Sequence, residues 1–187
     1  APYQGVEDAT FGTKIPHSDG LLIERWYYEE RGIIRFDLAP LPTDAIISKA
    51  TLSLYIESYP GLNNNLKPQG KMEFDLFVLN RDWDGDKVNW DTYDGTNSWV
   101  NPGGDFLSEP VSTATINTSD AIGNLWLEFD VTSWVRGCLN GTYNSRYGLL
   151  LRALNRIYPI LSFTSSGSSN QNLRPKLTIE YTSRAPI

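Results

Sequence analysis

The chain has 187 residues, 40% of them hydrophobic and 12% aromatic, which is enough to bury one sizeable core, and we expect a single domain over residues 1–187. Its formal net charge of −6 argues against nucleic acid and anionic membrane surfaces as partners, because phosphate groups are bound by dense clusters of Lys and Arg. No run approaches the roughly 20 apolar residues of a transmembrane helix, so we expect no membrane insertion.

The first half of the chain predicts short strands separated by turns. Strands are expected over residues 9–11, 21–28, 32–38, 45–58 and 74–79. In the third of these, Ile34, Phe36 and Leu38 share one face, which is the period of a half-buried strand. The charged residues 29–31 predict a turn just before it.

The second half predicts a long loop over residues 81–105, followed by strands at 113–116, 125–130, 148–153, 160–164 and 176–181. Between two of these strands the apolar pattern changes to the spacing of one helical face, given by Val131, Val135, Cys138 and Leu139. We therefore expect one short helix near residues 131–140, ended by Gly141. Its apolar surroundings predict that Cys138 is a buried, unreactive thiol.

Many short alternating strands with turns between them and almost no helix predict an all-β protein. The expected fold is an antiparallel jelly-roll β-sandwich with one short helix near residues 131–140. Its core is expected to contain Phe36, Leu38, Leu52, Leu54, Ile56, Phe129, Leu149, Leu151, Leu177 and Ile179.

Several segments, in this order and spacing, carry a family resemblance. They are GIIRFDLAPLPTDAIISKATLSLYI at 32–56, Trp83 and Trp90 in RDWDGDKVNW, NPGGDF at 101–106, LEFDVTSWV at 127–135, YGLLLRA at 147–153 and RPKLTIEY at 174–181. With them the chain resembles the DNRLRE family of extracellular β-sandwich modules, and most closely its archaeal branch, the disaggregatase-related repeat domains.

The resemblance implies a jelly-roll sandwich and a place outside the cell, with other domains of a larger surface protein as neighbours. Members of the broader family resemble carbohydrate-binding modules for acidic polysaccharides, and the archaeal repeats occur in large cell-surface proteins. The chain departs from the pattern at Gly85, where relatives usually carry Glu, so the role of that carboxylate is shifted to a neighbour or lost.

Three functions from different classes fit the sequence. The leading hypothesis is a non-catalytic, secreted or cell-surface module that binds acidic polysaccharide of the cell surface or matrix. A structural or spacer repeat of a surface protein is the alternative. A polysaccharide-degrading enzyme, a lyase or a glycosidase, ranks third, because His17 is the single histidine and no nucleophile, zinc or phosphate-loop motif is present.

The predicted carbohydrate-binding residues combine arginine with aromatic rings. Arg35 and Arg152 each lie opposite the larger apolar set of their strands, so both guanidinium groups project from one face if these strands share a sheet. Arg156 and Tyr158 follow in the next loop. Arg grips a carboxylate or sulfate in two places while a nearby ring stacks on the sugar. The alternative is that Arg35 pairs with a carboxylate of its own sheet, at Asp37 or Glu57.

The remaining aromatic residues divide into two groups. Trp26, Tyr27, Tyr28, Trp99 and Tyr158 are weakly constrained by pattern, and we name Trp26 and Tyr28 as further candidates for sugar stacking. Trp83, Trp90, Trp126 and Trp134 are expected to pack in the core or under loops.

A structural Ca²⁺ is the one cofactor the sequence suggests. Jelly-roll modules often hold calcium between a glycine turn such as NPGGD, the N-terminal segment and the last strand, and the oxygen-rich candidates there are Glu7, Asp8, Asp105 and Glu180. The alternating acidic residues Asp82, Asp84 and Asp86 suit calcium less well, and the alternative is that they cap turns in a solvated loop.

Overall fold

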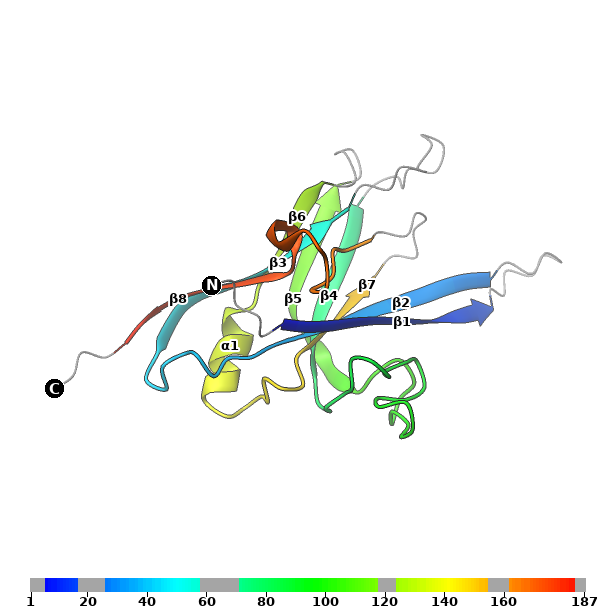
Figure 1. The fold of residues 1–187 in the computed structure, drawn as a ribbon, viewed down its shortest axis with the longest axis horizontal. Coiled ribbons are helices and arrows are strands. Elements are labelled where there is room, and N and C mark those ends of the chain that lie inside the picture. Colours follow the sequence, from blue (N-terminus) through cyan, green and yellow to red (C-terminus); the bar gives the residue numbers. More distant parts are fainter. Residues whose placement is uncertain (1–5, 17–25, 58–70, 118–123, 155–161, 184–187) are drawn as a thin grey trace.

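The structure is a computed structural model that describes residues 6–16, 26–57, 71–117, 124–154 and 162–183. It contains two antiparallel sheets, one short α-helix and one turn of 3-10 helix at Gln171–Leu173 (Figure 1). This confirms the predicted all-β sandwich.

The larger sheet has five strands in the order β1-β2-β7-β4-β5. Their bounds are Val6–Pro16 for β1, Trp26–Phe36 for β2, Leu149–Ala153 for β7, Lys71–Leu79 for β4 and Phe106–Asn117 for β5. The smaller sheet has three strands in the order β6-β3-β8, with bounds Leu125–Asp130, Ile46–Ile56 and Lys176–Thr182. Along the chain most connections cross from one sheet to the other, as in a jelly roll.

The turn predicted at residues 29–31 is wrong, because β2 runs without a break from Trp26 to Phe36. Every residue of β2 is paired with β1. The two strands form a ribbon that extends past the end of the shorter β7 (Figure 1). The charged residues 29–31 therefore lie within a strand, where their backbone pairs with residues 11–13 of β1.

The main core lies between the two sheets. Phe36, Leu52, Ile56, Phe129 and Leu149 are each at most 3% exposed. The other predicted core residues are also buried there, except that Leu177 and Ile179 of the edge strand β8 are partly buried and pack against it. Strand alternation therefore predicted the composition of this core.

The helix α1, Thr132–Leu139, adds Trp134 and Val135 to the same core. Gly141 follows with a φ of 82°, a left-handed conformation that suits glycine at a helix end. Cys138 is partly buried, and burial raises the pKa of its thiol to about 12, which favours the protonated form at neutral pH. No helix within the described residues is long and apolar enough to cross a membrane.

A second hydrophobic cluster lies on the outer face of the five-stranded sheet. The long connection between β4 and β5, which we call the 80–105 loop, folds over this face. Its Trp83 and Trp99 are 3% and 4% exposed and pack with Ile33, Phe77 and Leu150 of the sheet. Trp99 is therefore buried rather than exposed. The 80–105 loop thus covers hydrophobic residues of the sheet that lie beside the polar residues of the candidate site.

Candidate functional site

The arginines of interest lie on the outer face of the five-stranded sheet. Arg31 of β2 pairs in register with Arg152 of β7, and Arg35 lies four residues further along β2. All three guanidinium groups contact rings on this face, Arg35 at Trp83 and the other two at Phe106. The prediction that Arg35 and Arg152 project from one face of one sheet is confirmed.

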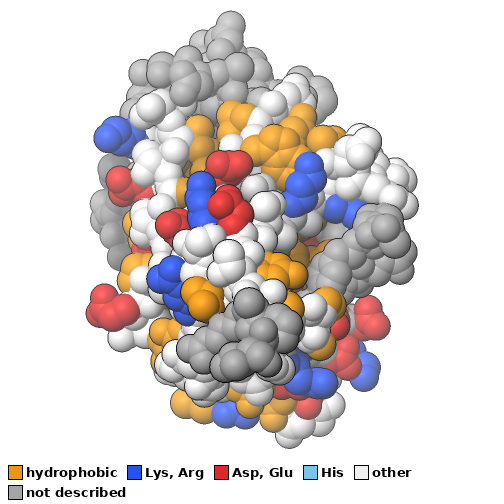
Figure 2. All heavy atoms as spheres, turned by 90° about the vertical axis from the view of Figure 1, so that its left-hand side faces the viewer, with side chains coloured by type: hydrophobic (Ala, Val, Ile, Leu, Met, Phe, Trp, Pro, Cys, Tyr) orange, Lys and Arg blue, Asp and Glu red, His pale blue; other side chains and the backbone are white. Residues whose placement is uncertain are grey.

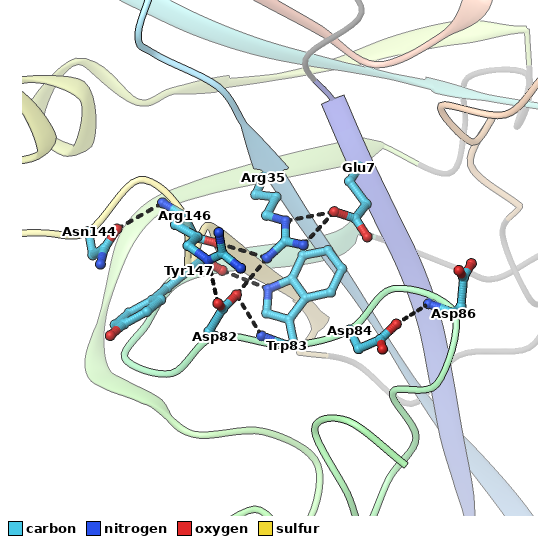
Figure 3. A network of polar contacts seen from close by, with 9 residues as sticks. All are labelled: Glu7, Arg35, Asp82, Trp83, Asp84, Asp86, Asn144, Arg146 and Tyr147. Carbon is cyan, nitrogen blue, oxygen red and sulfur yellow. Dashed lines mark hydrogen bonds and ion pairs between the residues drawn. The ribbon is translucent and has the colours of Figure 1, made fainter.

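Arg35 is the centre of a polar network that the sequence did not reveal (Figure 3). Its Nε donates to Glu7 Oε2 at 2.8 Å, and its Nη1 donates to Asp82 Oδ1 at 2.7 Å. Its guanidinium carbon lies 4.3 Å from the centre of the Trp83 ring, and the side chain is 17% exposed. Neither Asp37 nor Glu57 is its partner, so Arg35 is ion-paired as the alternative proposed but through different carboxylates.

Asp82 joins Arg35 to the loop before β7. Its second oxygen, Oδ2, accepts a hydrogen bond from Arg146 Nε, and Oδ1 also accepts from the backbone N–H of Trp83. Burial alone would raise the pKa of the Asp82 carboxyl, but the hydrogen bonds from Arg146 and Trp83 and the charge of Arg35 outweigh it and lower that pKa. Trp83 Nε1 in turn donates to the carbonyl of Tyr147 at 2.8 Å. The network thus fastens the 80–105 loop to β1, β2 and the segment before β7.

The NPGGD turn at the end of the 80–105 loop is organised by Asp105. Its carboxylate accepts hydrogen bonds from Val100 N at 3.0 Å, Asn101 N at 2.9 Å and Arg81 Nε at 2.9 Å, and its side chain is 5% exposed. Burial would raise the pKa of Asp105, but the two backbone N–H groups and Arg81 together lower it. The carboxylate is therefore stabilised as an anion by donors of the protein itself.

The four predicted calcium ligands are distributed over both sheets and the 80–105 loop. Glu7 binds Arg35, Asp8 accepts from Ser166 N at 2.7 Å, and Glu180 of β8 lies opposite Lys49 of β3 in the smaller sheet. Across the described ranges, no group of three or more His, Cys, Asp or Glu is arranged to hold a metal ion. Calcium stays a prediction, and these four residues are not brought together.

The acidic residues of the 80–105 loop cap its turns. Asp84 accepts from the backbone N–H of Asp86 and pairs with Lys87, while Asp94 accepts from the N–H groups of Thr96 and Asn97. These bonds match the alternative in which the carboxylates stabilise a solvated loop.

Arg31 and Arg152 form the most unusual pair on this face. Both lie within 6 Å of the Phe106 ring, at 5.6 and 5.9 Å from its centre, although like charges directly opposite in a sheet repel each other. Arg31 also donates to Gly103 O at 2.7 Å. Within the described residues the Arg152 side chain has no hydrogen bond or ion pair, and its guanidinium also contacts the Phe77 ring at 4.6 Å.

The strand on the other side of Arg152 carries a carboxylate with which Arg152 forms no ion pair in the described part of the chain. Asp75 of β4 is paired in register with Arg152, is 7% exposed and accepts from Thr113 Oγ1 at 2.7 Å. The Arg152 guanidinium therefore contacts the same ring as Arg31 instead of forming an ion pair with Asp75. Both guanidinium groups thus lie near the Phe106 ring, although the Arg31 guanidinium is closer to the Trp90 ring, at 4.7 Å.

The structure describes the other predicted sugar-binding residues only by their backbone or not at all. Trp26 and Tyr28 lie in the part of β2 that pairs with residues 14–16 of β1, and the structure does not describe their side chains. Arg156 and Tyr158 lie outside the described residues. Sequence reasoning missed Arg31, because the charged run was taken for a turn, although its even spacing from Arg35 would have placed both on one strand face.

A comparison with protein families matches residues 18–179 to the disaggregatase related repeat domain. No curated protein matches the chain significantly.

Proposed function

The chain belongs to the disaggregatase related repeat domain family, and from this premise we propose that it is a non-catalytic module that binds acidic polysaccharide at the cell surface or in an extracellular matrix. A repeat domain is a module of a larger protein. The proposal adds a ligand and a location to that assignment.

The observation that supports binding is the convergence of Arg31 and Arg152 on Phe106. Each guanidinium offers a planar fork of donors that suits a carboxylate or a sulfate. The apolar ring beneath would contact the sugar, because aromatic surfaces stack on the C–H groups of a pyranose.

The negative net charge does not prevent this binding. Exposed charges more than about 8 Å apart are largely screened at physiological ionic strength. A uronic acid group at this site would therefore interact mainly with Arg31 and Arg152 and only weakly with the distant acidic residues. A site with two charge contacts predicts weak binding that falls as salt rises.

The Asp82 carboxylate of the Arg35 network is poorly suited to act as a general acid. A general acid in a glycosidase needs a raised pKa, whereas the hydrogen bonds to Asp82 lower its pKa. The same network favours the structural alternative, since a module that acts only as a spacer also needs its loops fixed. Ligand binding at Arg152 separates the two functions.

The test uses Arg152→Ala, because Arg152 contacts rings but no carboxylate within the described residues, so its removal should leave the fold intact. Lys49→Ala removes the same charge from an exposed site on the other sheet and is the matched control. In affinity gel electrophoresis with polygalacturonate, we expect Arg152→Ala to bind at least about tenfold more weakly, the loss of one good charged contact. Lys49→Ala should bind like the parent protein. Equal retardation of Arg152→Ala and the parent would contradict the proposal.

A further inference from the structure

The outer face of the three-stranded sheet carries an aromatic pair that the arginine site does not use. Trp126 of β6 lies directly opposite Tyr55 of β3, with ring centres 5.1 Å apart and ring planes at 66°. The Nζ atom of Lys176 on β8 lies 4.1 Å from the centre of the Trp126 ring. Both rings are half-buried and Lys176 is exposed. Trp126 therefore does not pack in the core, which was one of the two positions expected from the sequence.

Strand alternation explains this position. Leu127 and Phe129 of β6 point into the core, where they are 4% and 1% exposed, so Trp126 and Glu128 point outward. On β3, Leu54 is buried while its neighbour Tyr55 faces the surface. Trp126 therefore packs with Tyr55 on the solvent side of the sheet and not in the core.

The next outward-facing residues of the three strands place a hydrogen-bond donor, Lys176, and an acceptor, Glu128, beside the rings. Ser53 of β3 pairs with Glu128 on one side and with Lys176 on the other. Ser53 is small, so the longer flanking side chains stand above it. No ion pair of Glu128 or Lys176 occurs in the part of the chain that the structure describes, and the ammonium lies over Trp126 instead.

We infer that Trp126, Tyr55, Lys176 and Glu128 form a second carbohydrate site that takes a neutral pyranose ring. The sugar would stack a C–H face on the aromatic pair, while Lys176 donates to its hydroxyl groups and Glu128 accepts from them. An exposed cation–π contact is weak, so a sugar can displace the ammonium from the indole face. This inference goes beyond the proposed function and does not depend on Arg152.

The charges of this face favour a neutral ligand over an acidic one. Register places Glu128, Asp130 and Glu180 on it, against the two lysines Lys49 and Lys176. Figure 2 shows the side of the molecule on which β8 and α1 lie in Figure 1, and there acidic and basic side chains are interspersed with hydrophobic patches rather than gathered into one positive field. A polyanion would gain little from such a surface.

The test is affinity gel electrophoresis of the whole chain against a panel of soluble neutral polymers, a glucan, a mannan and a galactan. We expect at least one polymer to retard the protein equally at 0.05 and about 0.5 M salt, because stacking and neutral hydrogen bonds are weakly screened. Trp126→Ala should weaken this binding about tenfold or more, consistent with roughly 1–2 kcal/mol of lost ring contact.

Two controls separate this site from the first one. Arg152→Ala should keep the neutral binding, and Trp126→Ala should keep the binding to polygalacturonate. Trp126→Phe retains a ring and should be intermediate, and a melting curve like that of the parent shows that each variant is folded. Failure of every neutral polymer to retard the parent protein, or equal binding by folded Trp126→Ala, would overturn the inference while leaving the arginine site untouched.

Discussion

Replacing Asp105 by alanine tests whether protein donors alone organise the NPGGD turn. The variant leaves the N–H groups of Val100 and Asn101 without their acceptor and removes the partner of Arg81. An unsatisfied buried donor costs about 1–3 kcal/mol. The Val100 side chain is 73% exposed, so water reaches this turn and the lower part of that range applies.

We therefore expect Asp105→Ala to lower the free energy of unfolding by about 2–4 kcal/mol, since the exposed part of the Arg81 ion pair adds little. For a chain of this length the melting temperature should fall by roughly 5–15 °C. Asp105→Asn keeps an acceptor oxygen and should lose less.

The assay is thermal unfolding followed by circular dichroism at neutral pH, in EDTA and in excess Ca²⁺. The loss should be the same in both solutions if hydrogen bonds to protein donors are its cause. A variant as stable as the parent in EDTA would refute this reasoning. A loss seen only with calcium would show that Asp105 acts as a metal ligand instead.

Four further outcomes are expected. Leu54→Ala or Phe129→Ala should each cost about 2–5 kcal/mol in urea unfolding, because each empties a buried site between the sheets. If calcium binds anywhere on the chain, EDTA should lower the melting temperature reversibly through ligand linkage, and an unchanged melting curve with no metal in the untreated protein would remove that prediction. Folding lowers the pKa of carboxyls such as Asp82, so their stabilisation should be complete above about pH 4 and should be lost as the pH falls through the folded pKa values, which a series of melting curves between pH 7 and about pH 2 would show. Gly103→Ala should be more destabilising than Gly141→Ala in the same urea assay, since both have positive φ but an added Cβ meets close neighbours only at the first.

Much of the fold could be predicted from the sequence because burial in a sandwich follows a period of two. The alternation of Leu52 and Leu54 with polar neighbours, and of Leu127 and Phe129 with Trp126 and Glu128, identified the inner faces before any pairing was known. Strand ends were harder, because β2 continues through the charged residues 29–31 by pairing with β1, and pairing with a distant segment leaves no periodic signal in the sequence. The charged run in β2 was therefore misread as a turn.

The candidate site was predictable only in part. Alternation placed Arg35 and Arg152 on one face, but the partners of Arg35 lie far along the chain, at Glu7 and Asp82. Only the folded 80–105 loop brings Asp82 to that strand. As a result Arg35 fastens the loop, and Arg31 rather than Arg35 is the neighbour of Arg152. A double variant of Arg35 and Arg152 would confuse lost folding with lost binding, which is why the single variant at Arg152 is the cleaner probe.

The most direct test of the binding site is an NMR titration of the arginine Nε–H signals with a trigalacturonate. The site proposed here predicts salt-sensitive shifts at Arg31 and Arg152, while the signal of Arg35, already bonded to Glu7, stays in place. Shifts confined to other arginines, or the absence of any shift at Arg152 at saturating ligand, would contradict it.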